Sequence, residues 1–176
     1  SLWSKRAFMY RKRHCIPHEH SHMAILIQPM LVPEYAFVMH TVNPLNNNAR
    51  ELYLELAVGM GQTLTSGDIP GTPYRFICNK HTEEVKLMAY ANFSQSLIPS
   101  PSGDFLKETL DYGKIRLSTD GDYADRLARR LASIGRRVEI SMEAPQDIEG
   151  VIKNNKVYLV QTRPQSSPDE RQEVSC

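Results

Sequence analysis

The spacing of apolar residues predicts one long helix in the C-terminal half of the chain. Between residues 122 and 142, apolar side chains recur at intervals of three or four residues, which is the period of a helix with one apolar face. These positions are Leu127, Leu131, Ile134 and Val138. Residues 1–13 show a shorter pattern of the same kind and predict a basic, partly amphipathic helix.

Short apolar runs, some of them alternating with polar residues, predict several β-strands. The runs cover residues 23–30, 35–41, 51–58, 74–78 and 85–90. Two further runs, at residues 147–152 and 156–161, flank a pair of asparagines and predict a β-hairpin. Residues 92–103 have no apolar period and are expected to form an exposed loop, and the polar tail at 166–176 is expected to be disordered.

The composition is typical of a soluble globular protein. Of the 176 residues, 41% are hydrophobic and 23% are charged, and the net charge is +1. This balance offers no basic excess that would attract nucleic acid or a membrane surface. No apolar run approaches the ~20 residues of a membrane-spanning helix. We therefore expect an intracellular, soluble protein with neither nucleic acid nor membrane as a partner.

The predicted C-terminal hairpin carries the main candidate site. Alternation places Asp147 and Glu149 on one face of its first strand, and Gln161 and Arg163 on one face of its second. If the two faces coincide, the carboxylate and amide oxygens suit Mg²⁺, and the guanidinium suits phosphate. Spacing by itself favours a plainer alternative, in which Asp147 and Arg163 form a surface ion pair and Gln161 is a solvated edge residue.

A family resemblance bears on this choice. Residues 146–150 (Gln-Asp-Ile-Glu-Gly) and 157–165 (Val-Tyr-Leu-Val-Gln-Thr-Arg-Pro-Gln) resemble the end of the ATP-grasp domain of pyruvate phosphate dikinases, phosphoenolpyruvate synthases and glucan water dikinases. The resemblance implies that ATP and Mg²⁺ are the cofactors. It implies that Asp147, Glu149 and Gln161 surround the metal and that Arg163 meets the phosphates. Glu149, Gln161 and Arg163 would be the catalytic residues.

The same resemblance covers residues 1–165 and implies an α+β fold. This region would be the C-terminal half of an ATP-grasp domain, with a mostly antiparallel sheet flanked by helices. Residues 23–31 are similar to the strand on which the family's adenine rests, so Gln28, Pro29, Met30 and Leu31 are candidates for adenine binding. A plain core strand with Met30 as filler fits the composition equally well.

Two further motifs refine the resemblance. Residues 40–44 (His-Thr-Val-Asn-Pro) and 91–94 (Ala-Asn-Phe-Ser) are similar to the starch-phosphorylating dikinases. Together with residues 63–67 and 71–75, they resemble the phosphoglucan branch slightly more than the glucan branch. The family's Gly-Leu-Gly-Glu is Gly-Met-Gly-Gln at residues 59–62, so Gln62 replaces a carboxylate near the nucleotide's sugar and phosphates. Its amide accepts a hydrogen bond but adds no negative charge.

The implied activity is a dikinase reaction of a larger enzyme. The β-phosphate of ATP would pass through a phosphohistidine to an α-glucan, and the γ-phosphate would pass to water. The phosphohistidine domain and the glucan-binding modules have no counterpart in this sequence, so the isolated chain is expected to be inactive. The alternative is a truncated, non-catalytic ATP-grasp remnant that binds nucleotide or serves as an interaction module.

Two other clusters have a functional and a plain interpretation. His14, Cys15, His18, His20 and His22 could bind zinc or nickel, but histidines scattered along a surface loop are the usual interpretation. Five arginines on the long helix could bind polyanions, but they are more typical of a solvated helix face. They are Arg126, Arg129, Arg130, Arg136 and Arg137.

Overall fold

The computed structural model describes residues 2–67, 69–100 and 104–165. These residues form two compact units, one ending at Met30 and the other spanning Leu31–Gln165, and each is described by itself. The expected disordered tail lies outside the described residues. The end of the predicted domain at residue 165 stays a prediction.

The N-terminal unit contains a short helix packed against a 3-10 turn. Helix α1 (Lys5–Arg13) is capped by Ser4, whose side chain accepts a hydrogen bond from the Ala7 amide. The turn η1 (His18–His20) follows. Arg11 donates through Nε to Nδ1 of His18 at 2.8 Å, and the Phe8 ring stacks on the same imidazole. His18 therefore has a structural role in this unit.

The predicted strand at residues 23–30 is wrong. Residues 21–33 contain neither helix nor strand, and Ile25, Leu26 and Ile27 are 81%, 78% and 91% exposed. A strand needs a neighbour to pair its backbone N–H and C=O groups. Among the described residues no strand pairs with this segment, so its apolar composition alone does not produce a strand.

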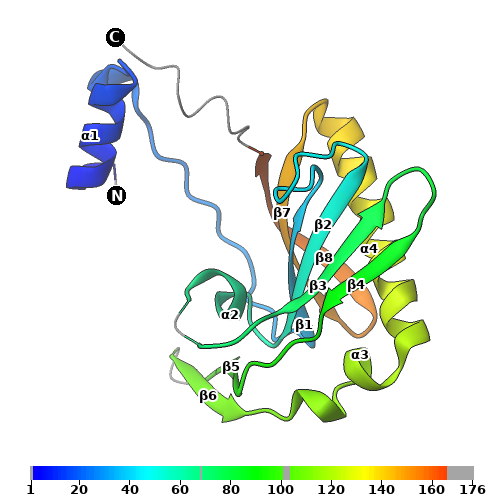
Figure 1. Cartoon of the computed structure of the whole chain (residues 1–176). Helices are drawn as coiled ribbons and strands as arrows, with labels where there is room; N and C mark the ends of the chain where they lie inside the picture. Colours follow the sequence, from blue (N-terminus) through cyan, green and yellow to red (C-terminus); the bar gives the residue numbers. More distant parts are fainter. Residues whose placement is uncertain (1, 68, 101–103, 166–176) are drawn as a thin grey trace. The chain divides into compact units, whose positions relative to one another are not determined.

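The larger unit is built on a six-stranded sheet in the order β4-β3-β2-β1-β7-β8 (Figure 1). Every pair of neighbours is antiparallel. The strands are β1 (Tyr35–His40), β2 (Glu51–Val58), β3 (Tyr74–Asn79), β4 (Val85–Ala89), β7 (Gln146–Lys153) and β8 (Lys156–Pro164). The predicted α+β class with a mostly antiparallel sheet is confirmed, and so are these strands and the hairpin.

Helix α4 (Gly121–Met142) covers one face of this sheet (Figure 1). Its apolar stripe packs on side chains that alternate inward from β1, β2, β3 and β7. Gly135 sits where the helix comes closest to the sheet, because a Cβ there would lie 2.7 Å from Met39 Sδ and from Leu52 Cδ1. The opposite face of the sheet carries the residues that alternate with these inward side chains, among them the polar side chains of His40, Tyr53 and Glu55.

A second, two-stranded sheet corrects another expectation. Strand β5 (Gln95–Pro99) lies within residues 92–103, the region expected to form an exposed loop, and it pairs antiparallel with β6 (Phe105–Thr109) just beyond them. Phe93, Ser96 and Leu97 are buried, and the Leu97 carbonyl accepts a hydrogen bond from the Met60 amide at 3.2 Å. Contacts with the rest of the unit thus hold a strand that has no apolar period of its own.

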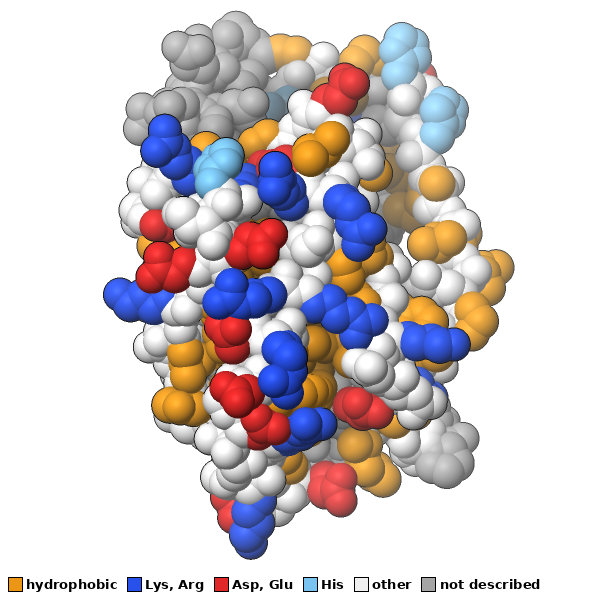
Figure 2. Space-filling view, turned by 90° about the vertical axis from the view of Figure 1, so that its right-hand side faces the viewer, with side chains coloured by type: hydrophobic (Ala, Val, Ile, Leu, Met, Phe, Trp, Pro, Cys, Tyr) orange, Lys and Arg blue, Asp and Glu red, His pale blue; other side chains and the backbone are white. Residues whose placement is uncertain are grey.

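Short elements complete the unit: α2 (Gln62–Thr65), η2 (Tyr112–Lys114) and α3 (Arg116–Thr119). On the side that carries α4, acidic and basic side chains are interspersed (Figure 2). Arg129 pairs with Asp125 at 2.7 Å, and Arg130 donates to the Asn155 carbonyl. This supports the solvated-face interpretation of the helix arginines.

None of the helices in the described part of the chain is long and apolar enough to cross a membrane.

Candidate functional site

Four candidate side chains meet on the open face of the sheet, at the start of β7 and the end of β8. The register places Asp147 directly opposite Arg163 and Glu149 directly opposite Gln161. A bulge follows, between Glu149 and Gly150, and shifts the pairing of the rest of the hairpin. Two carboxylates, an amide and a guanidinium therefore form two neighbouring cross-strand pairs on one surface.

Asp147 and Arg163 form an ion pair. The Nε and Nη2 atoms of Arg163 donate to the same oxygen of Asp147, Oδ2, at 2.8 and 2.6 Å. The carboxylate side chain is 11% exposed, whereas the arginine side chain is 64% exposed. Hydrogen bonds to Asp147, and then its charge, raise the pKa of Arg163. The ion pair that spacing favoured is present, and it leaves the Nη1 end of the guanidinium open to a further anion.

A third strand adds a histidine to this row of side chains. His40 on β1 lies opposite Asp147, with its Nδ1 at 3.6 Å from Oδ1. Both atoms are buried, and neither has a hydrogen-bond partner among the described residues. A buried polar atom without a hydrogen-bond partner costs about 1–3 kcal/mol of stability. A hydrogen bond between these two atoms would remove that cost.

The neighbouring row offers oxygen ligands for a hard cation. Within the described part of the chain, the side chains of Glu149 and Gln161 make no hydrogen bond, and the buried Oδ1 of Asp147 is also without one. Mg²⁺ is usually held by one or two carboxylates together with phosphates and water. These three oxygen donors fit that requirement, although no group of three or more His, Cys, Asp or Glu side chains that could hold a metal occurs among the described residues.

A second ion pair lies farther along the same face. Arg75 on β3 donates through Nε to Glu55 on β2 at 2.8 Å, and the Tyr53 hydroxyl donates to the same carboxylate oxygen at 3.0 Å. Val38 of β1 separates Glu55 from Glu149 in the register. Burial raises the pKa of Tyr53 to about 12. This pair has the same chemistry as Asp147 with Arg163, but Glu55 lies three strands away from Gln161 and Arg75 lies four.

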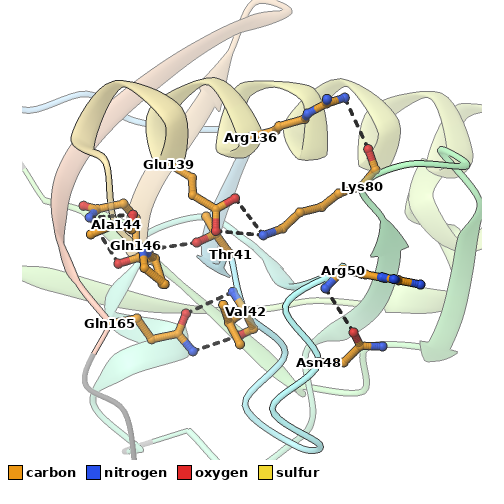
Figure 3. Close-up of polar contacts among 11 residues, drawn as sticks. Thr41, Val42, Asn48, Arg50, Lys80, Arg136, Glu139, Ala144, Gln146 and Gln165 are labelled. Atoms are coloured by element: carbon orange, nitrogen blue, oxygen red, sulfur yellow. Dashed lines mark hydrogen bonds and ion pairs between the residues drawn. The ribbon is translucent and has the colours of Figure 1, made fainter.

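Hydrogen bonds at the strand ends hold the row in place (Figure 3). The Thr41 amide donates to the Gln146 carbonyl at 2.9 Å, and the Gln146 amide donates to Thr41 Oγ1 at 2.8 Å. The Gln165 side chain accepts from the Val42 amide at 3.1 Å and donates to its carbonyl at 2.8 Å. These contacts tie β1 to both strands of the hairpin directly beside His40, Asp147 and Arg163.

The other candidate residues do not belong to the hairpin. Gln28, Pro29 and Met30 are exposed residues of the N-terminal unit, and Leu31 begins the larger unit. Gln62 is the first residue of α2 and is exposed. The structure thus brings together the four hairpin residues, and their roles and those of Gln28 to Leu31 and Gln62 stay predictions.

Sequence reasoning missed His40 as a site residue. The signal is a polar residue near the end of the apolar run at 35–41, on the same face as Val38. Its meaning depends on β1 lying beside β7, and the pairing of distant strands cannot be read from alternation.

Comparison with known proteins matches the chain to one family. The family profile described as "Pyruvate phosphate dikinase, AMP/ATP-binding domain" matches residues 1–175. The chain is similar to the chloroplastic alpha-glucan water dikinase of Citrus reticulata, with 32% identity over 94% of the chain and 13% of that protein. It is similar to the phosphoenolpyruvate synthase of Pyrococcus furiosus, with 28% identity over 99% of the chain and 22% of that protein. The chain therefore spans less than a quarter of the length of these relatives.

Proposed function

The chain belongs to the pyruvate phosphate dikinase AMP/ATP-binding domain family, and from this membership we propose that it is the ATP-binding portion of an α-glucan or phosphoglucan water dikinase. In the complete enzyme the β-phosphate of ATP passes through a phosphohistidine to the glucan, and the γ-phosphate passes to water. The observation that carries the proposal is the pairing of Asp147 with Arg163 and of Glu149 with Gln161 on the open face of the sheet.

Each residue has a role in holding the triphosphate. Arg163 donates from its open Nη1 end to a phosphate oxygen, and Asp147 keeps its guanidinium in place. Glu149, Gln161 and the free oxygen of Asp147 hold Mg²⁺, which when bound neutralises charge on the phosphates. Phosphoryl transfer depends mainly on such positioning and charge neutralisation. The resemblance assigns adenine binding to Gln28 to Leu31, and the side-chain oxygen of Gln62 accepts a hydrogen bond from a ribose hydroxyl.

The proposal is tested by removing the arginine in a protein that also contains the phosphohistidine domain. With ATP labelled at the β-phosphate, Arg163→Ala should abolish labelling of the histidine, because the phosphate loses its charged donor. The matched control is Arg75→Ala, which breaks the other Arg–carboxylate pair on the same face and should leave labelling within about twofold. Normal labelling of Arg163→Ala would refute the role of the hairpin.

The same experiment addresses the non-catalytic alternative. Gln62 puts a neutral amide where the resemblance implies a carboxylate, which favours weak turnover. If the unaltered protein binds Mg²⁺-ATP but transfers no β-phosphate, and Gln62→Glu restores transfer, the chain is a nucleotide-binding remnant. If the unaltered protein transfers phosphate, that alternative is excluded.

A further inference from the structure

We propose that His40 is a positioning residue of this site: its imidazole holds Oδ1 of Asp147, and through Asp147 it sets the orientation of the Arg163 guanidinium. The three side chains lie in one row across β1, β7 and β8, because His40 is the register partner of Asp147 and Asp147 is that of Arg163. The effect of His40 on nucleotide binding rests on the proposed function. The contact itself does not.

The distribution of hydrogen bonds on Asp147 supports this role. Both donors of Arg163 go to Oδ2, which leaves Oδ1 buried and without a partner among the described residues. Nδ1 of His40 is also buried and without a partner, and it lies 3.6 Å from Oδ1. This distance is longer than an N–H···O hydrogen bond, and a small rotation of the ring or the carboxylate brings it into range.

The surroundings of His40 leave Asp147 as its partner. Tyr53 lies on the other side of the imidazole, with ring centroids 6.2 Å apart, and its hydroxyl is committed to Glu55. The backbone after His40 is fixed by the paired hydrogen bonds of Thr41 with Gln146. The ring is therefore held at its base and flanked on one face, so that Nδ1 is directed toward Oδ1.

A hydrogen bond from His40 to Oδ1 would limit the rotation of the Asp147 carboxylate. With Arg163 alone on Oδ2, the terminal torsion of Asp147 is broad, and the exposed guanidinium turns with it. A donor on Oδ1 fixes the plane of the carboxylate, and with it the direction in which Nη1 points. Because an oxygen has two lone pairs, Oδ1 still accepts a metal. Hydrogen bonds of this kind behind a metal ligand are worth about 10- to 100-fold in affinity.

The binding test compares two replacements of His40 by calorimetric titration of the 176-residue chain with Mg²⁺-ATP and with AMP. His40→Phe keeps the size of the ring and removes the donor, so Mg²⁺-ATP should bind roughly tenfold more weakly. AMP lacks the outer phosphates and should bind within about twofold of the unaltered chain. His40→Asn places an amide N–H near the position of Nδ1 and should keep Mg²⁺-ATP affinity within about threefold. His81→Phe, an exposed histidine outside this row, is the matched control.

Two outcomes overturn the proposal. One is unchanged Mg²⁺-ATP affinity in His40→Phe. The other is an equal loss in His40→Phe and His40→Asn, which would assign the effect to shape instead of the hydrogen bond. If the unaltered chain binds no nucleotide, the proposed function fails, and nuclear magnetic resonance of the nucleotide-free chain decides the contact.

The spectroscopic test needs no ligand. Donation to Asp147 requires the proton of neutral His40 on Nδ1, whereas a histidine in water prefers the proton on Nε2. Nitrogen-15 spectra should therefore show the Nδ1–H tautomer for His40. The Arg163 Nε–H signal should shift and broaden in His40→Phe but not in His81→Phe. An Nε2–H tautomer, or an Arg163 signal that ignores the substitution, would refute positioning by His40.

Discussion

Gly150→Ala tests whether the bulge beside the candidate site has room for any side chain. A Cβ at this position would overlap the ring of Phe37 and would lie 2.7 Å from the Tyr158 carbonyl oxygen. Phe37 is 1% exposed, and the carbonyl belongs to the backbone of β8, so neither neighbour moves without displacing a strand. Overpacking of this kind costs about 1–3 kcal/mol of stability. Because the backbone of β8 would also have to move, we expect a loss of about 3 kcal/mol.

The assay is thermal unfolding followed by circular dichroism. In a protein of this size about 1 kcal/mol changes Tm by ~2–4 °C, so Gly150→Ala should lower Tm by ~6–12 °C. The matched control is Gly121→Ala at the start of α4, where a new Cβ meets nothing within 4 Å. That change should leave Tm unchanged or raise it slightly, because alanine favours the helix. A Gly150→Ala protein that melts within about 2 °C of the unaltered chain would refute the packing argument.

Two further predictions concern stability. The side chain of Lys80 is 9% exposed and contacts both oxygens of Glu139, at 2.7 and 2.6 Å (Figure 3). Glu139→Gln leaves this ammonium without its counter-ion, so the free energy of unfolding measured in urea should fall by roughly 3 kcal/mol. Replacing both residues by Met and Leu should recover at least half of that loss, and no recovery would contradict the reasoning. Burial raises the pKa of the Cys78 thiol from 9.0 to about 12, and that of Tyr53 from 10.0 to about 12. The unfolded chain therefore loses these protons first, so the free energy of unfolding should be steady from about pH 7 to about pH 9 and should fall above it. A flat profile to about pH 11 would contradict burial of these groups.

Local periodicity accounts for much of the fold. The apolar stripe of α4 and the alternation in β1, β2 and β3 are set by neighbours within a few residues, so the sequence predicts their positions closely. The same alternation in β7 and β8 predicts that Asp147 and Glu149 share a face and that Gln161 and Arg163 share one. The hairpin turn at Asn154 and Asn155, both with positive φ, then brings the two faces together.

Distant contacts account for what the sequence does not reveal. The position of β1 between β2 and β7 makes His40 a neighbour of Asp147, and no local pattern carries that information. The strand β5 pairs with β6 and accepts a hydrogen bond from Met60 at Leu97, although its own residues show no period. Conversely, residues 23–30 have the composition of a strand but no strand to pair with in the described part of the chain. From the sequence, Gly135 only lowers the helix propensity of α4. In the structure, its missing side chain leaves space for Met39 and Leu52.

The order of the sheet has a consequence for how the chain folds. Strands β1 to β4 are neighbours in sequence, but β1 also pairs with β7, and Gln146 lies 105 residues from its partner Thr41. Closing so long a loop is slow, and until the hairpin docks one edge of β1 is open to pairing with other chains. We therefore expect His40, Asp147 and Arg163 to come together late in folding. ATP that binds only this completed state should increase the yield of refolding by mass action and should reduce aggregation during it.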